Sequence, residues 1–153
     1  MLTNRVLDWR NVLGDLIEAN RFRPFEWGQH DCALWAASAI AAVTGQDPAE
    51  AVRGTYKGKL GARQRIKRYY GCEDLQQVMT KITGKEPVHV AFARAGDIVS
   101  ADLNRLGIGE TVNFLGMSLG VCNGARSFFV GETADRVGLI ELDTLALDCA
   151  HHV

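Results

Sequence analysis

The sequence predicts an α+β fold in which N-terminal helices pack on a C-terminal antiparallel sheet. Helical periodicity and capping residues dominate the first half of the chain. After Gly84 the texture changes to short β-type runs separated by Gly, Asn and Asp. An alanine-rich, almost entirely apolar segment near residue 32 indicates a helix that is buried on all sides. With 153 residues, 47% of them hydrophobic, the chain is expected to form a single domain, 1–153, with its own core.

The composition argues against several classes of protein. The chain has 17 Lys and Arg against 18 Asp and Glu, so no overall field directs it to nucleic acid or to a membrane surface. Its first 20 residues are amphipathic, so we expect neither a signal peptide nor a membrane span, and synthesis in a cytoplasm. The cysteines form no CxxC pair, and we therefore expect no disulfide framework, no metal site and no cofactor: Cys32, Cys72, Cys122 and Cys149.

The first expected helix carries one apolar stripe and ends near Asn20. Its apolar residues recur at spacings of four, three, four and three, the period of one helix face: Leu2, Val6, Trp9, Leu13 and Leu16. Thr3 is the expected N-cap of this helix. The segment 21–30 is an expected loop, because Pro24 and Gly28 interrupt regular structure there.

The second expected helix runs from Cys32 to Thr44 and is the central helix of the domain. Asp31 is its expected N-cap, and Gly45 is expected to end it. Cys32 therefore occupies the first helical position, where unpaired amide groups and the helix dipole stabilise an anion. We expect thiolate character at Cys32, which nucleophilic catalysis needs, although the charge of Asp31 opposes it.

Two further helices are expected before the β-type runs. Asp47, Pro48 and Glu50 give the start signals of a short helix: a cap, a proline in the first turn and a glutamate three residues after the cap. The segment 73–83 places its apolar residues on one helix face and ends at Gly84. The expected strands then lie at 88–92, 97–100, 111–115, 117–122, 127–130 and 139–142.

Three motifs follow one another between about residues 20 and 130. The first is 24–28 (PFEWG) with Asp31 and Cys32, the second is 94–99 (RAGDIV), and the third is 118–124 (SLGVCNG). In order and spacing they resemble the motifs of the NlpC-type papain-like cell-wall cysteine peptidases, most closely the short phage-encoded versions found beside tail-tip genes. This resemblance implies a papain-like fold, Cys32 as the candidate nucleophile, and a cleft lined by Phe25, Trp27 and Asp31.

The chain departs from this family pattern at the residues that would assist the thiol. In active relatives the base histidine falls where this chain has Ser118, and the residue that orients the base falls at or near Val130. The loop tyrosine that helps to stabilise the oxyanion is Phe25 here, which has no hydroxyl group. General-base assistance is worth about 10²–10⁴-fold in rate, so the resemblance implies an impaired catalyst.

Other histidines could in principle replace the missing base. His30 lies two residues before the thiol but is expected to point away from it. His151 and His152 could fold back toward the thiol, although we expect a mobile tail there. His89 is expected on a strand, with its ring satisfied or facing solvent. Asp97 is expected to fix the turn into its strand.

A run of six cations is interleaved with three tyrosines: Lys57, Lys59, Arg63, Arg65, Lys67 and Arg68, with Tyr56, Tyr69 and Tyr70. We expect a solvated helix face. A partner-binding surface is the alternative, because Tyr and Arg are enriched at protein interfaces. Nucleic acid is not an expected partner, since the overall charge gives it no support.

Three functions remain in view. We favour a phage tail-tip or hub component of the virion, with a peptidase-like fold, lost chemistry and other tail proteins as partners. The alternative is an active cysteine peptidase or amidase that cleaves peptidoglycan peptides during infection, in which Cys32 attacks the carbonyl and backbone amides hold the oxyanion. A thiol-based ligand-binding module of cellular origin is the third.

Overall fold

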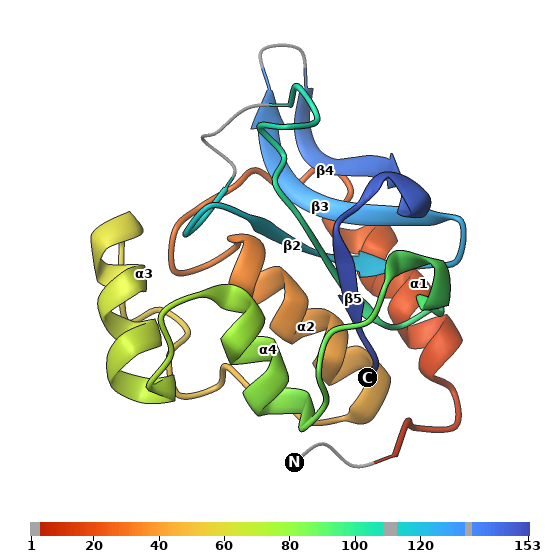
Figure 1. Ribbon diagram of the computed structural model, residues 1–153, viewed down its shortest axis with the longest axis horizontal. Coiled ribbons are helices and arrows are strands. Elements are labelled where there is room, and N and C mark those ends of the chain that lie inside the picture. Colours follow the sequence, from red (N-terminus) through yellow and green to blue (C-terminus); the bar gives the residue numbers. More distant parts are fainter. Residues whose placement is uncertain (1–3, 109–112, 134–135) are drawn as a thin grey trace.

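The computed structural model describes residues 4–108, 113–133 and 136–153. Within these residues, helices pack with a five-stranded antiparallel sheet of strand order β4-β3-β2-β1-β5, which confirms the expected α+β class (Figure 1). The helical elements are α1 (Trp9–Asn20), α2 (Cys32–Thr44), α3 (Lys59–Arg65), the π-helix η1 (Ile66–Tyr70), α4 (Leu75–Thr83), and the 3₁₀ turns η2 (Val90–Phe92) and η4 (Thr144–Ala146). The strands are β1 (Ile98–Ala101), β2 (Ser118–Cys122), β3 (Arg126–Thr133), β4 (Arg136–Asp143) and β5 (Cys149–His151).

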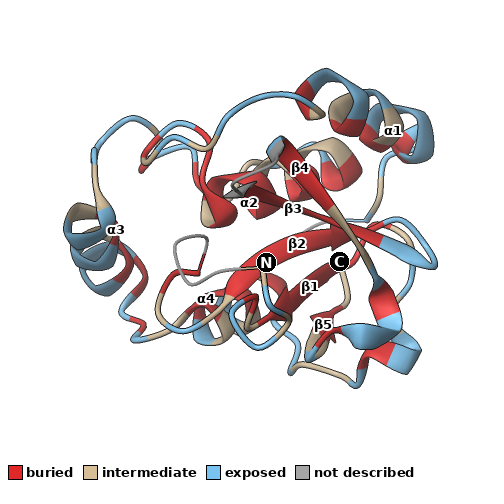
Figure 2. Ribbon diagram, turned by 90° about the horizontal axis from the view of Figure 1, so that it is seen from above, coloured by how far each residue is buried: buried red, intermediate tan, exposed pale blue. Residues whose placement is uncertain are grey.

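Helix α2 is the central helix, as the sequence predicts. Its N-cap is Asp31, whose Oδ1 accepts a hydrogen bond from Leu34 N at 3.0 Å. Gly45 ends it in the left-handed conformation, with φ of 78°. The helix packs on β1, β2 and β3, and the Trp35 indole nitrogen donates to the Phe128 carbonyl at 2.9 Å. Figure 2 shows α2 and the central strands as the most continuously buried part of the molecule.

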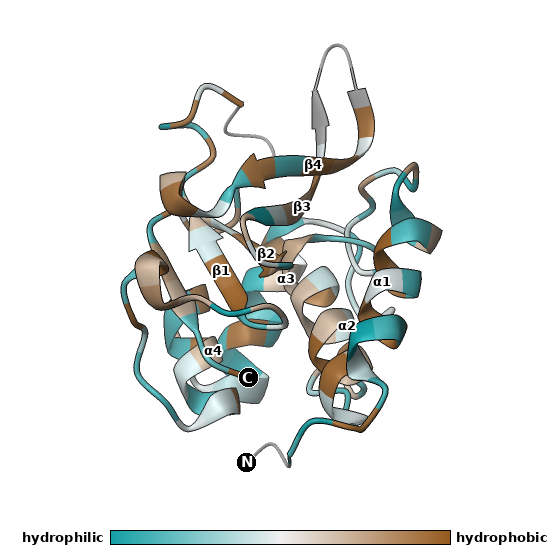
Figure 3. Ribbon diagram, turned by 90° about the vertical axis from the view of Figure 1, so that its right-hand side faces the viewer, coloured by the Kyte–Doolittle hydropathy of each residue, from teal (hydrophilic) through white to brown (hydrophobic). Residues whose placement is uncertain are grey.

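Helix α1 is amphipathic and ends at Asn20 as predicted, but it begins at Trp9, after Asp8. The predicted cap Thr3 and the first stripe residue, Leu2, lie outside the described residues. The reason for the late start is tertiary: Val6 N donates to the Val43 carbonyl at 2.9 Å, which fixes the preceding segment against the end of α2. Figure 3 shows both apolar and hydrophilic turns along α1, in keeping with its one buried face.

The predicted helix at 47–50 is wrong. Asp47 does act as a cap, because its Oδ1 accepts from Ala49 N at 3.0 Å, but the chain continues as turns. Two contacts divert it: Arg53 pairs with Asp47 at 2.7 Å, and Gly54 N donates to the Gly28 carbonyl at 2.8 Å. These contacts hold the segment against the loop that precedes α2, so helical hydrogen bonding stops after one turn.

The sheet separates two apolar clusters. Leu119, Val121 and Val130 belong to the cluster around α2, whereas Val99 and Phe129 belong to the cluster on the opposite face. The strands predicted at 97–100, 117–122, 127–130 and 139–142 are present. The segment 88–92 instead makes a single bridge and the turn η2. Of the strand predicted at 111–115, residues 111 and 112 lie outside the described residues, and 113–115 form only an isolated bridge, from Phe114 to Met117.

The C-terminal tail forms β5, so the prediction of a mobile tail is wrong. In the sheet Cys149 pairs with Ser100 and His151 with Ile98. The sequence signal for this strand is weak, because β5 is only three residues long. Its position depends on contacts with α4 and β1.

Asp97 fixes the turn into β1, as predicted, and also joins distant parts of the chain. Its fully buried carboxylate accepts hydrogen bonds from Arg94 N at 2.8 Å and Val153 N at 3.1 Å. It also contacts the Arg5 guanidinium at 3.1 Å and His152 Nδ1 at 2.7 Å. The carboxylate thus ties the segment before α1 and the end of the chain to the sheet.

Candidate functional site

The Cys32 thiol is buried at the start of α2, with 1% of its surface exposed. Burial raises its pKa to about 12, and the negative charge of Asp31 acts in the same direction. The Leu119 and Ala33 amides and the Ser118 hydroxyl favour the thiolate but do not outweigh burial. The expectation of thiolate character at Cys32 is therefore wrong: the helix start provides its dipole, but burial dominates.

Ser118 lies beside this thiol, because β2 begins against the start of α2. Its hydroxyl is close enough to favour an ionised sulfur, yet Oγ forms no hydrogen bond of normal geometry with any described residue. The residue is fully buried. The structure therefore brings together Cys32 and the position where the family resemblance expects a base, and that position holds an unpaired hydroxyl.

His30 is buried near α2 but makes no hydrogen bond to the Cys32 thiol. Its ring packs edge-on against Trp35, with 5.9 Å between ring centroids, and its Nε2 has no hydrogen-bond partner among the described residues. Burial lowers its pKa to about 4, and the charge of Arg23 adds to that shift. The ring is therefore neutral at pH 7 and has no bond to Cys32.

The remaining histidines are engaged elsewhere. His151 Nε2 lies 3.0 Å from Thr80 Oγ1, between β5 and α4. His152 is bonded to Asp97, and the exposed His89 accepts from a backbone amide of its own turn rather than lying on a strand. None of the chain's histidines, all of which are described, hydrogen-bonds to the Cys32 sulfur.

The expected position of the base-orienting residue offers no polar group. Val130 is fully buried on β3, opposite Leu139 of β4, within the apolar cluster around α2. Val130 therefore provides no hydrogen-bonding side chain that could orient a base.

Asp31 has more partners than an ordinary N-cap. Besides Leu34 N, its carboxylate accepts from Gly28 N at 3.0 Å and from the Tyr56 hydroxyl at 2.6 Å. Burial and the Asp31 charge raise the pKa of Tyr56, so the phenol stays protonated and donates. The sequence does not predict this hydrogen bond, because Asp31 lies 25 residues before Tyr56 and Tyr56 stands next to the basic run.

Gly28 explains the close approach of the two segments that carry Asp31 and Tyr56. Its φ is +80°, and a Cβ atom built there would lie 1.9 Å from the Tyr56 carbonyl oxygen. A residue with a side chain would fit neither the conformation nor the space. The Trp-Gly element of the first motif is thus required by packing.

Three aromatic rings pack edge to face in the loops before α2 and β2. Ring centroids are 5.0 Å apart for Phe25 and Trp27, and 5.6 Å apart for Trp27 and Phe114. Phe114 precedes β2 in a tight turn, in which Leu115 has the left-handed φ of 54°. The predicted cleft residues Phe25 and Trp27 therefore belong to one aromatic cluster, and Trp27 and Asp31 also line a cavity.

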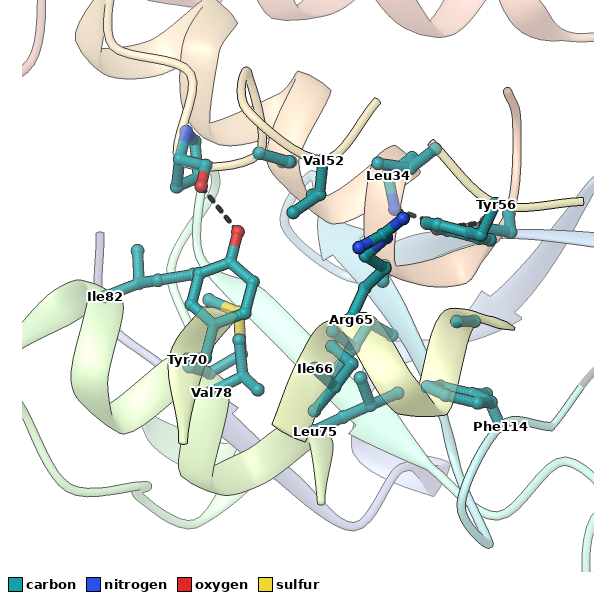
Figure 4. Close-up of a pocket in the computed structure, with 18 of the residues that line it drawn as sticks. Leu34, Val52, Tyr56, Arg65, Ile66, Tyr70, Leu75, Val78, Ile82 and Phe114 are labelled. Atoms are coloured by element: carbon teal, nitrogen blue, oxygen red, sulfur yellow. Dashed lines mark hydrogen bonds between the residues drawn. The ribbon is translucent and has the colours of Figure 1, made fainter. Parts of the chain in front are cut away.

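An apolar cavity of about 40 Å³ extends from this cluster toward α4 (Figure 4). Trp27, Asp31 and Phe114 line one end, and Phe25 does not line it. At the other end the Tyr70 hydroxyl donates to the Pro48 carbonyl at 2.6 Å. The cavity passes the neighbours of Cys32 without including the thiol, so the sulfur is enclosed.

Comparison with known proteins places the chain in one family. The model of a family described as a domain of unknown function, DUF6950, matches residues 4–153, so the chain belongs to that family. No curated protein and no solved structure matches it. Among the described residues, no helix combines the length and the apolar character that crossing a bilayer requires.

Proposed function

We propose that this member of the DUF6950 family is a non-catalytic, NlpC-like domain that serves as a structural component of a phage tail tip or hub. Its place would be the virion tail, and its partners other tail proteins. The tail assignment rests on the motif resemblance to phage-encoded relatives. The loss of chemistry rests on one observation: the Cys32 thiol is enclosed beside Ser118, with no imidazole bonded to it.

The chemistry of the thiol supports a non-catalytic role. Burial holds the pKa of the thiol far above neutral, so Cys32 is protonated at pH 7. A thiol without a general base also forgoes about 10²–10⁴-fold in rate. Since only 1% of the residue is exposed, a substrate carbonyl has no path to the sulfur in this conformation.

The arrangement of elements supports the papain-like part of the proposal. The candidate nucleophile opens the central helix, that helix packs on an antiparallel sheet, and the expected base position opens a neighbouring strand. This is the juxtaposition that the motif order would require of an NlpC-like domain. The fold alone assigns no function, so the virion role needs its own test.

Two measurements test the proposed function. Purified protein incubated with peptidoglycan sacculi should release no peptide fragments, and Cys32→Ala should behave identically. Release that disappears in Cys32→Ala would overturn the loss of chemistry. Virions purified from cells that carry this gene should contain the protein at a fixed, low copy number, and its absence from mature particles would refute the structural role.

An active peptidase or amidase is the second candidate, and one observation favours it. The Ala33 and Leu119 amides and the Ser118 hydroxyl are all directed so as to favour a thiolate at Cys32. Such groups would stabilise negative charge if the site opened and water or a partner supplied a base. The sacculus assay with Cys32→Ala decides between the two candidates.

A further inference from the structure

Arg65 is a half-buried cation without an acidic partner. Its guanidinium makes one hydrogen bond, from Nη2 to the Thr55 carbonyl at 3.3 Å, and no ion pair with any described residue. Figure 4 shows this side chain among the residues that line the apolar cavity, which include Leu34 and Tyr56. A guanidinium that is partly removed from water is stabilised by a carboxylate, so Arg65 is available to pair with an acidic group from another molecule.

The other half-buried arginines in the described part of the chain all have a carboxylate partner. Arg5 pairs with Asp97 at 3.1 Å, and Arg53 pairs with Asp47 at 2.7 Å. Arg21 pairs with Glu18 at 2.6 Å. The fold therefore supplies a carboxylate wherever an arginine is withdrawn from solvent, with Arg65 as the exception within the described residues.

Arg65 lines two surface grooves, of about 320 and 470 Å³. Both are lined by Thr55, Arg65 and Arg68, and neither has an acidic lining residue. Tyr69 also lines the first groove, and Gln64 also lines the second. Both arginines can thus be reached by a partner from either groove.

The backbone at the grooves is unusual. Helix α3 passes directly into the π-helix η1, which begins at Ile66, between the two arginines. Single π-turns are rare and frequently occur at functional sites. In Figures 1 and 2, α3 stands at the edge of the molecule, away from the sheet. The arm formed by 57–70 is therefore free to meet a partner.

The surroundings of the grooves indicate the chemistry of that partner. Within the described residues Lys57, Lys59 and Arg63 make no ion pair, so the arm is cationic although the chain has a net charge of −1. Tyr69 and Leu60 are 56% and 71% exposed. Arginine and tyrosine beside an exposed aliphatic side chain are typical of protein interfaces, and a guanidinium binds a carboxylate in bidentate fashion.

We propose that the arm 57–70 is a docking surface for an acidic segment of a protein partner, with side-chain carboxylates of that segment bound by Arg65 and Arg68. A nucleic-acid backbone fits less well, because phosphates would draw equally on the exposed lysines and would not need a recessed guanidinium. This docking surface is independent of the proposed function, because binding of an acidic peptide can be measured on the purified protein alone.

The test uses a fluorescent ten-residue peptide of Glu and Asp with one Leu, titrated by anisotropy against the full chain. We expect Arg65→Gln and Arg68→Gln each to weaken binding by at least about tenfold. Lys59→Gln removes the same charge from the same arm outside both grooves, and should weaken binding by no more than about threefold. Arg68→Lys should fall between these values, since it keeps the charge but loses the planar fork.

Three results would overturn the proposal. The first is the absence of peptide binding by the wild-type chain, and the second is an equal loss in Lys59→Gln and in the arginine variants. The third is tighter binding of a single-stranded oligonucleotide of the same charge, with the same dependence on Arg65, which would assign the surface to nucleic acid. Arg68 is exposed, so Arg68→Gln keeps the test valid if Arg65→Gln impairs folding.

Discussion

The Cys32 thiol and the Ser118 hydroxyl lie side by side, at the point where the first residue of α2 meets the first residue of β2. One residue is the candidate nucleophile and the other stands where the family resemblance expects the base. Both are buried, and the hydroxyl has no hydrogen-bond partner of normal geometry. This pair sets the chemistry of the site.

Alkylation of Cys32 in the folded protein should be slow at neutral pH. The pKa of about 12 and the 1% exposure leave neither thiolate nor access for iodoacetamide. Site-resolved mass spectrometry at pH 8 should find the half-buried Cys149 modified before Cys32. Selective labelling of Cys32 near pH 6–7 would show that the thiol is activated, contrary to this prediction.

Ser118→Ala should leave stability unchanged or raise the free energy of unfolding by up to about 1 kcal/mol. The variant removes a buried hydroxyl that lacks a partner, so little is lost with it. Urea denaturation measures the effect. Ser100→Ala is the matched control, because the buried Ser100 hydroxyl lies 2.9 Å from Cys149 Sγ and its removal should destabilise. A loss above about 1 kcal/mol in Ser118→Ala would mean that the hydroxyl is satisfied in solution.

Tyr56→Phe should lower the free energy of unfolding by about 1–2 kcal/mol. The phenol donates to the buried Asp31 carboxylate at 2.6 Å, and its removal leaves that oxygen with one donor fewer. The exposed Tyr69 is the control, and Tyr69→Phe should change stability by less than about 0.5 kcal/mol. Equal effects in the two variants would show that the hydrogen bond from Tyr56 to Asp31 does not contribute to the free energy of unfolding.

Gly28→Ala should destabilise the fold by more than about 3 kcal/mol or prevent folding. The substitution combines a left-handed backbone with a Cβ placed 1.9 Å from the Tyr56 carbonyl oxygen. Gly107→Ala separates the two causes, because Gly107 has a φ of +76° but nothing within 4 Å of the added atom. Its cost should be about 1–2 kcal/mol, the strain alone. Similar costs at the two positions would contradict the close packing of Gly28.

The free energy of unfolding should fall as the pH drops from about 6.5 to about 4. Burial lowers the pKa of both His30 and His151 to about 4, so between these values the unfolded chain binds more protons than the folded one. This stabilisation is fully present above the unfolded pKa and is lost as the pH falls. His151→Gln should flatten the dependence measured by urea titration, whereas His89→Gln, at an exposed position, should not. A pH profile unaffected by His151→Gln would contradict burial of that ring.

Sequence patterns correctly predicted a helix whose ends are fixed by residues close to them in the chain. Asp31 and Gly45 bound α2 as their types suggest, because capping depends on atoms within a few residues. The start signals at Asp47 failed for the opposite reason: Arg53 and Gly54 make contacts that compete with helix propagation. The short strand β5 could not be predicted, since it depends on β1 and α4 for its partners.

The sequence predicted that Cys32 and Ser118 are neighbours, but it did not predict the burial and protonation of the thiol. The motif order placed Ser118 opposite Cys32, and the structure brings the two together. The spacing could not show that the thiol would be enclosed, or that Tyr56 would supply a hydroxyl to Asp31. It also could not show that Arg65 alone among the half-buried, described arginines would lack a carboxylate.

The sequence by itself determined the α+β class, the central helix that begins at Cys32, and the absence of a histidine at position 118, because these follow from residue type and periodicity along the chain. Only the tertiary structure decided the state of the thiol and the partners of each charge. Desolvation and ion pairing depend on which atoms surround a group in space, and those atoms come from segments far apart in the sequence. Cys32 thus has the helix position of a nucleophile, and its burial makes it an ordinary protonated thiol.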